Sequence, residues 1–346
     1  MAVCSCGFSG FPASRVAAPD DAILIPWKNG ILRVVEKTHE CDLVALDKRR
    51  YASLYSPIWS PDRRTIAYEG FVEIPAPDDC HSPEISAEIR VTTPQGDADV
   101  VLSTTRSTDS VSPIGWSPDR MKLWYRDSDH IYFVDGRGRK VTTTGYDPYE
   151  GGTGTGWSSI HDAGLSPDGT RIAISGDRAG VRGLVIDVYD IEANRLLNGR
   201  RIYGTAERTR VSPGEESWSA DSLWQLIWLD NNQVIFTERG VEHSNTRTGP
   251  TGTRYSTIVL LNVNNSGIQQ LFSGSSDQEL TDIQATGDRR GIAFRIGTPV
   301  PDTWEPEMAW RLCTMDFTSG QITIDDLSWL SVEADRLIKE NSTYGL

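Results

Sequence analysis

A histidine and several carboxylates carry the clearest potential for chemistry in this sequence. His161 and Asp162 come just before a predicted inner strand, Asp282 holds the matching place two repeats later, and Ser56 holds it in an earlier repeat. A histidine that faces carboxylates can bind a metal ion or act as a general base. We favour a structural histidine, because the five histidines of the chain are scattered along it. We therefore predict no catalytic residue, no metal site and no cofactor.

A second group of candidates combines aromatic and acidic side chains, most of them in long predicted loops. Such a combination suits a cationic peptide, a protein or a sugar ring. The alternative is that these are solvated loop residues and that each tryptophan only holds its loop in place. With the residues named above, the candidate binding residues are Tyr149, Trp157, His161, Asp162, Trp218, Asp282 and Trp304.

Motifs of common enzyme classes are missing or incomplete. The Gly-x-Ser-x-Gly turn of serine hydrolases does not occur in the sequence. The glycine-rich run 151–156 resembles a phosphate-binding loop in composition only, because neither the lysine nor the helix of that motif follows it. Cys4 and Cys6 form a single pair, which is too few ligands for a tetrahedral zinc site. We expect no peptidase activity from this chain.

Composition excludes some partners and favours others. The chain carries a net charge of −14, and phosphate binding needs a cationic surface, so we expect no nucleic-acid partner. The same charge favours a cationic partner. No run of about 18 apolar residues occurs, so we expect no membrane span. The odd number of cysteines, five, and the lack of a secretory signal favour a soluble cytoplasmic protein, or a periplasmic or secreted one if the chain is processed.

The elements that must position these residues are repeated along the chain. Trp59–Asp62, Trp116–Asp119 and Leu165–Asp168 each read Trp/Leu-Ser-Pro-Asp and precede an apolar run, and weaker copies contain Asn231 and Asp288. The intervals between the equivalent Asp and Asn residues are about 57, 49, 63 and 57 residues. Intervals of this length are typical of propeller blades with loop insertions.

The acidic residue of each copy has a structural interpretation. Proline sets φ for a turn, the Asp side chain accepts hydrogen bonds from the following backbone N–H groups, and a glycine at the next position takes positive φ. We therefore assign four aspartates to tight turns between strands rather than to catalysis. These are Asp62, Asp119, Asp168 and Asp288.

Each repeat is interpreted as four short strands, which predicts an all-β protein, a β-propeller with six four-stranded blades. Residues 22–54 supply a compact repeat of this kind, with a hairpin turn at Trp27–Gly30. The expected strands of the fifth repeat are 224–229, 233–238, 256–263 and 268–272.

The repeats resemble the TolB-like propeller repeat, the WD40-like Trp-Ser-Pro-Asp-Gly type also called PD40, over roughly residues 20–325. The resemblance implies a propeller, and such propellers include protein-binding scaffolds, gates of prolyl-oligopeptidase-type hydrolases and a few polysaccharide lyases. The expected organisation is an N-terminal tail or closing segment at 1–20 and a propeller at 21–326. A C-terminal segment at 327–346 would close the ring or form a short helix at 331–340.

Loop lengths indicate which face of the expected propeller carries the function. The turns between first and second strands and between third and fourth strands are tight, whereas every long insertion falls on the other connections. We predict a non-catalytic scaffold that binds a protein or peptide on that elaborated face. The alternatives are a carbohydrate-active or sugar-binding propeller that uses channel carboxylates and His161, and a propeller subunit of a larger assembly. The long connections are 69–87, 145–160, 205–222, 239–254 and 297–308.

Overall fold

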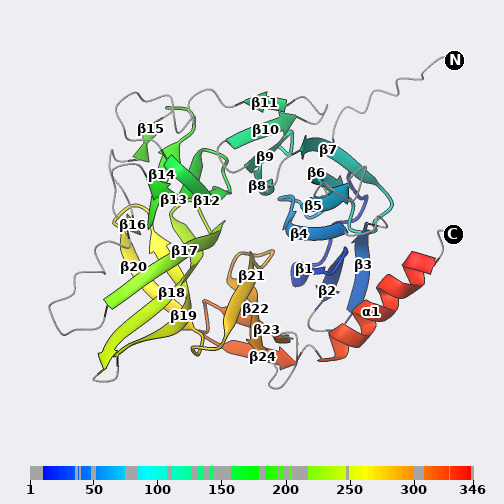
Figure 1. The fold of residues 1–346 in the computed structure, drawn as a ribbon. Helices are drawn as coiled ribbons and strands as arrows, with labels where there is room; N and C mark the ends of the chain where they lie inside the picture. Colours follow the sequence, from blue (N-terminus) through cyan, green and yellow to red (C-terminus); the bar gives the residue numbers. More distant parts are fainter. Residues whose placement is uncertain are drawn as a thin grey trace, which may run out of the picture. The chain divides into compact units, whose positions relative to one another are not determined.

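The computed structural model divides the chain into two compact units, Met1–Thr144 with Ala334–Leu346, and Gly145–Glu333. Both units are built from antiparallel sheets, and each unit is described by itself (Figure 1). The structure describes residues 11–35, 38, 40–47, 52–74, 84–106, 111–126, 131–135, 140–142, 157–178, 184–193, 195–197, 203–204, 217–246, 249–299, 308–326 and 328–343.

The described part of the first unit contains three antiparallel sheets. Sheet A has three strands and sheets B and C have four strands each, and in every sheet consecutive strands are neighbours. Sheet A contains β1 (Ala22–Trp27), β2 (Gly30–Val35) and β3 (Glu40–Leu46); sheet B contains β4 (Ala52–Trp59), β5 (Ile66–Ile74), β6 (Glu84–Thr92) and β7 (Asp99–Arg106); sheet C contains β8 (Ser112–Trp116), β9 (Lys122–Arg126), β10 (Ile131–Asp135) and β11 (Lys140–Thr142).

The second unit also has three antiparallel sheets in its described part. Sheet D has the order β12-β13-β14-β15, with β16 paired to β14, and sheets E and F have four consecutive strands each. Sheet D contains β12 (Trp157–Leu165), β13 (Arg171–Arg178), β14 (Leu184–Asp190), β15 (Arg195–Leu196) and β16 (Tyr203–Gly204); sheet E contains β17 (Ser217–Trp228), β18 (Gln233–Thr246), β19 (Gly249–Asn262) and β20 (Gly267–Ser273); sheet F contains β21 (Glu279–Ala285), β22 (Gly291–Pro299), β23 (Met308–Asp316) and β24 (Ile322–Asp326).

Strands that are buried on both faces bring each sheet against the next sheet of its unit. In β14 the five successive residues Leu184–Val188 are all buried, which is typical of a strand covered on both sides. The core between sheets D and E joins Ile186 to Trp228, and the core between E and F joins Ile235 to Phe294. In the first unit, apolar clusters join A to B and B to C in the same way. Face-to-face stacking of small antiparallel sheets is how neighbouring propeller blades pack.

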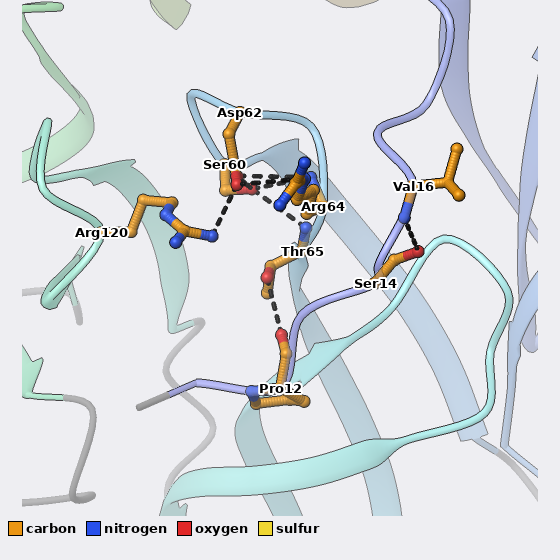
Figure 2. Close-up of polar contacts among 8 residues, drawn as sticks. All are labelled: Pro12, Ser14, Val16, Ser60, Asp62, Arg64, Thr65 and Arg120. Atoms are coloured by element: carbon orange, nitrogen blue, oxygen red, sulfur yellow. Dashed lines mark hydrogen bonds and ion pairs between the residues drawn. The ribbon is translucent and has the colours of Figure 1, made fainter. Parts of the chain in front are cut away.

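The Ser-Pro-Asp segments form turns between the first and second strands of their sheets. In sheet B the Ser60 hydroxyl donates to Asp62 Oδ1 at 2.8 Å, and the N–H of Arg64 points to the same oxygen at 3.4 Å (Figure 2). The same pair of contacts, from a hydroxyl two residues before and an N–H two residues after, is made by Asp119, Asp168 and Asp288. The four aspartates therefore occupy equivalent turns.

Where the residue after the turn aspartate is an arginine, its side chain links the turn to the adjacent sheet. The φ at this position is 60° at Arg120, 56° at Arg289 and 70° at Gly169, in the left-handed region that a side chain disfavours. Arg120 Nη1 lies 2.6 Å from Asp62 Oδ2 of sheet B (Figure 2), and Arg289 Nη1 donates to the backbone oxygen of Trp228 at 2.8 Å. These contacts between sheets offset the backbone cost of an arginine at this position.

The N-terminal segment, residues 11–18, runs alongside the turn of sheet B. The Thr65 hydroxyl donates to the Pro12 carbonyl oxygen at 2.6 Å (Figure 2). The Phe11 ring meets the Trp116 ring edge-on, with centroids 5.0 Å apart. The segment thus contacts both sheet B and sheet C of the first unit.

Replacing Asp168 with alanine is expected to lower the free energy of unfolding by about 1–2 kcal/mol, because the contacts from Ser166 and Thr170 are lost. Burial would raise the pKa of the Asp168 carboxyl, but these hydrogen bonds outweigh burial and hold the pKa below its ordinary value. A lowered pKa stabilises the folded chain above about pH 4, and this stabilisation is lost as the pH falls through the folded-state pKa.

The difference between the denaturation midpoints of wild type and Asp168→Ala should therefore be constant near neutral pH and shrink below about pH 4. Glu192→Ala, at an exposed carboxylate of the same sheet region, serves as the control and should leave the midpoint unchanged. If Asp168→Ala melts like the wild type at pH 7, this aspartate does not stabilise the turn.

Several strands are longer than the sequence indicated. The prediction of a long loop at 239–254 is wrong, because β18 and β19 remain paired as far as Thr246 and Gly249. The predicted loop 69–87 is likewise shortened, because β5 runs to Ile74 and β6 begins at Glu84. The strand ends were predicted where the apolar pattern ends. Backbone hydrogen bonds between antiparallel strands do not depend on that pattern, and here they continue beyond it.

Both ends of the predicted propeller differ in detail from the prediction. Residues 52–54, which the sequence assigned to the first repeat, belong to β4 of sheet B. The helix predicted at 331–340 is longer, since α1 spans Ser328–Thr343. From Ala334 on it belongs to the first unit, where Trp27 Nε1 and Lys28 Nζ donate to Asp335 Oδ1 at 3.1 and 2.8 Å. In the part of the chain that is described, α1 included, no helix combines the length and apolar character needed to cross a bilayer.

Candidate functional site

The first strand of each sheet from B to F contains a β-bulge. At the bulges of sheets B, D, E and F, the residue six positions before the turn Asp or Asn is Ser56, Asp162, Gln225 and Asp282, respectively. Three of them, Ser56, Gln225 and Asp282, have positive φ of 49°, 60° and 55°. Bulges re-aim side chains and are common beside functional sites. The sequence had matched Ser56, Asp162 and Asp282 with one another, and Gln225 is the member that it missed.

In the second unit, a polar side chain at one bulge bonds the bulge of the next sheet. Asp162 Oδ1 accepts the N–H of Ala163 at 2.8 Å, and Asp162 Oδ2 accepts the N–H of Leu226 at 2.9 Å. The Gln225 amide in turn donates to the Thr281 hydroxyl at 3.4 Å. These contacts run from sheet D to E and from E to F, so the bulges support one another.

Asp282 is engaged by an arginine of its own sheet. Arg295 Nε donates to Asp282 Oδ2 at 2.5 Å, and Arg295 Nη2 contacts the same oxygen. The Arg295 guanidinium lies 4.5 Å above the centre of the Trp310 ring. The guanidinium is thus held between a carboxylate and an indole, with both charged groups largely buried.

His161 is bonded through one ring nitrogen, and its other ring nitrogen is buried. Its Nε2 lies 3.2 Å from Asp177 Oδ2, and since an ionised carboxylate only accepts hydrogen bonds, Nε2 carries the hydrogen. Its Nδ1 is buried and has no hydrogen-bond partner. A general base needs an accessible nitrogen within reach of the substrate. With one nitrogen engaged and the other buried, this histidine is better placed to orient its neighbours than to transfer a proton.

Trp224 presents an exposed aromatic ring at this site. Its ring stacks on the His161 ring, with centroids 6.2 Å apart and planes inclined by 23°, and 43% of the residue remains exposed. Trp224 was not among the predicted binding residues, because it is the first residue of the expected strand 224–229. A signal was available: Trp224 lies seven residues before Asn231, as His161 does before Asp168.

The remaining predicted binding residues are only partly described. Trp157 and Trp218 lie in β12 and β17, and their side chains are outside the described part of the structure. Tyr149 and Trp304 lie outside the described residues altogether. His161 and Asp162 are adjacent on β12, while Asp282 on β21 bonds Arg295. Within the described ranges, no three His, Cys, Asp or Glu side chains are grouped as a metal site would require.

No protein-family model matches the sequence, and no curated protein matches it either. Solved structures do resemble the chain. Hydrazine synthase from Kuenenia stuttgartiensis is 13% identical, with 92% of this chain and 97% of that chain covered and a TM-score of 0.49. An oligogalacturonate lyase from Vibrio parahaemolyticus is 11% identical, with 91% of this chain and 87% of that chain covered and a TM-score of 0.43. A putative TolB from Agrobacterium tumefaciens is 16% identical, with 69% of this chain and 86% of that chain covered and a TM-score of 0.38.

At these identities and scores the similarity carries no information on substrate or partner. The neighbours include propeller proteins, and this chain is all-β, with antiparallel sheets of three to five strands in its described residues. Its assignment to the TolB-like repeat family stays a prediction.

Proposed function

We propose that this chain is a non-catalytic binding protein, a propeller of six blades that holds a protein or peptide partner on the side of its long connections. The contacts at the bulges of the second unit carry this proposal. The groups best suited to catalysis, on His161, Asp162 and Asp282, are each bonded to another group of the protein. The Trp224 ring beside them is exposed. Exposed aromatic rings on a rigid, bonded framework suit recognition rather than proton transfer.

The six-bladed ring is supported by the number and packing of the sheets. Six antiparallel sheets are found in the described residues, and each packs on the next one of its unit. Equivalent turns in sheets B, C, D and F fit one repeat per blade. One propeller over residues 21–326 accounts for all of these features.

A cationic partner fits the charge of the chain. The net charge is −14, and the predicted anchors Tyr149, Trp157, Trp218 and Trp304 lie in or next to acidic long connections. Opposite charge speeds association and is screened by salt. An exposed indole also suits the face of a sugar ring, so a sugar-binding propeller is the second candidate.

Shortening one long connection at a time is expected to weaken binding. A partner would be identified by crosslinking the purified chain in native extract, and its affinity then measured with pure proteins. Replacing the connection between β22 and β23 with a short Gly-Ser linker removes the predicted anchor Trp304 and should raise Kd at least tenfold, by roughly 2 kcal/mol. Gln95→Ala, in a tight turn between β6 and β7, is the matched control and should leave Kd unchanged.

The same measurements can contradict the proposal. Loss of binding in Gln95→Ala together with normal binding by the shortened chains would place the partner on the side of the tight turns. Normal binding by every variant would point to the outer edges of the blades. An association rate that does not fall as salt rises would show that charge is not used.

A further inference from the structure

We infer that the outer edge of sheet F is a docking site for an extended, basic segment of another protein, which pairs with β24 as a fifth strand. β24 (Ile322–Asp326) is the last strand in the order β21-β22-β23-β24, so one of its edges pairs with β23 and the other ends the sheet (Figure 1). This edge is a second surface, and its use does not depend on the function proposed above for the long connections.

The strand register shows which backbone groups of β24 point away from sheet F. The Asp316 N–H donates to the Gln321 carbonyl oxygen at 3.0 Å, which makes these two residues a hydrogen-bonded pair at the start of the ladder. Such pairs alternate along antiparallel strands, so Thr323 bonds β23, and the backbone N–H and C=O groups of Ile322 and Ile324 point outward. Within the described residues, no hydrogen bond is found to these outward groups. They are four main-chain groups that an arriving antiparallel strand can bond.

The side chains of the same two residues are apolar and exposed. Ile322 is 40% exposed and Ile324 is 52% exposed. In the register they lie opposite Met315 and Cys313, which are buried in the core between sheets E and F, so all four side chains are on one face of sheet F. The core therefore continues to the edge of the sheet and ends there in two isoleucines. Aliphatic side chains at alternate positions of an arriving strand would cover them.

The outer strands of the other sheets carry features that oppose pairing, and β24 lacks these features. β3, β7 and β20 each contain an extra residue that forms a bulge, which disrupts a regular edge. β11, β15 and β16 are only two or three residues long, and the first two contain Lys140 and Arg195. Bulges, short length and basic side chains are common means of blocking a sheet edge. The five residues of β24 pair with β23 without a register shift and include no basic residue.

Charge favours a basic partner over a second copy of this chain. Residues 316–326 contain three aspartates, Asp316, Asp325 and Asp326, and no lysine, arginine or histidine. Two copies paired through β24 would bring two such segments together, each in a chain of net charge −14, and like charges oppose that contact. The chemistry that complements this edge is therefore a strand with aliphatic side chains and a positive charge.

The geometry of antiparallel pairing places the positive charge in the partner. If one partner residue lies opposite Ile324, the residue two positions later lies opposite Ile322 and the residue two positions earlier lies opposite Asp326. Opposite charges at directly opposed positions stabilise a strand pair. The recognised pattern is accordingly a lysine or arginine followed, at the second and fourth positions after it, by aliphatic residues.

The test uses the whole chain, labelled for NMR, and the peptide acetyl-Gly-Lys-Thr-Val-Thr-Val-Gly-amide. Binding is followed by the backbone amide signals of Ile322 and Ile324, assigned with the variants Ile322→Val and Ile324→Val. Two peptides are the controls: acetyl-Gly-Val-Val-Thr-Lys-Thr-Gly-amide, which has the same composition, and the first peptide N-methylated at both valines, which cannot donate to β24. We expect the first peptide to shift both signals saturably and each control to bind at least about fivefold more weakly.

Variants of the chain test the same edge from the other side. Ile324→Lys adds a cation to an exposed position and should weaken binding of the first peptide at least about fivefold while leaving the denaturation midpoint unchanged. Ile268→Lys is the matched control, because Ile268 is 47% exposed on β20, the outer strand of sheet E, and it should bind like the wild type. If circular dichroism shows that Ile324→Lys misfolds, the N-methylated peptide still tests the main-chain pairing on the wild-type protein.

Several results would overturn the inference. The first is the lack of a saturable shift of the Ile322 and Ile324 signals, and the second is equal binding of the first peptide and either control. Equal binding by a peptide with glutamate in place of the lysine would show that the edge does not select a basic partner. Shifts of the same signals when the chain alone is concentrated would show that a second copy occupies the edge. The loop-shortening experiment is scored on other segments, so its outcome is independent of these.

Discussion

Replacing Trp228 with alanine is expected to lower the free energy of unfolding by about 3–5 kcal/mol. Trp228 is 2% exposed and packs in the core between sheets D and E, against residues such as Ile186 and Leu261. Its Nε1–H donates to the Gly164 carbonyl oxygen of sheet D at 2.9 Å. The substitution would open a cavity between two sheets and leave a buried carbonyl without this donor, and both effects destabilise the folded chain.

Two further substitutions separate these effects. Trp228→Phe keeps most of the apolar surface but loses the hydrogen bond to Gly164, and should cost about 1–2 kcal/mol. Trp224→Ala, four residues earlier on the same strand, removes an exposed ring and should cost less than about 1 kcal/mol. Denaturant unfolding followed by circular dichroism gives all three values. Equal losses for Trp228→Ala and Trp224→Ala would show that the contact between sheets D and E is not a principal source of stability.

Replacing Arg295 with methionine is expected to cost about 3 kcal/mol. Arg295 and Asp282 are both largely buried, and the arginine also covers the Trp310 ring. Removing the cation would leave a carboxylate at a bulge with positive φ and without the group that offsets its charge. A buried charge that has lost its partner is far more costly than the pair itself is favourable.

A double-mutant cycle tests this explanation. Asp282→Asn removes the charge while keeping a residue that tolerates positive φ. The loss of unfolding free energy in the variant with both Asp282→Asn and Arg295→Met should be smaller than the sum of the two single losses by at least about 1 kcal/mol. Additive losses would mean that Arg295 stabilises sheet F through its packing on Trp310 rather than through Asp282.

The repeat made the turns predictable from the sequence. A serine or threonine two residues before an aspartate is enough to form the observed hydrogen bonds at Asp62, Asp119, Asp168 and Asp288 without help from the rest of the fold. These interactions are local, and local interactions leave a signature in consecutive residues. The same reasoning found the turn at Trp27–Gly30, where the two residues pair across β1 and β2.

Features that depend on pairing between strands were not predictable in the same way. The segment 239–254 contains glycine, proline and threonine, which favour loops, yet β18 and β19 pair along it as far as Thr246 and Gly249. The bulge between Trp224 and Ile227 adds one residue to β17. Strict alternation counted back from the buried Trp228 would place Trp224 inside and Leu223 outside, whereas Trp224 is exposed and Leu223 is buried. The engagement of His161 by Asp177 joins two strands and has no signature in either one alone.

The bond from Asp162 to the N–H of Leu226 has a consequence for how such a chain can change during evolution. The backbone of sheet E next to Trp224 is held by a side chain encoded one repeat earlier, and sheet D approaches so closely that a Cβ on Gly164 would lie 2.3 Å from the Leu226 oxygen. If the repeat that forms sheet E were duplicated or exchanged alone, its bulge would lose the Asp162 carboxylate that accepts the Leu226 N–H. It could also lie against a residue with a side chain at the position of Gly164, where only glycine fits. The unit of inheritance that preserves the Trp224 site is therefore a pair of adjacent repeats, and recombination that respects single repeat boundaries would not conserve it.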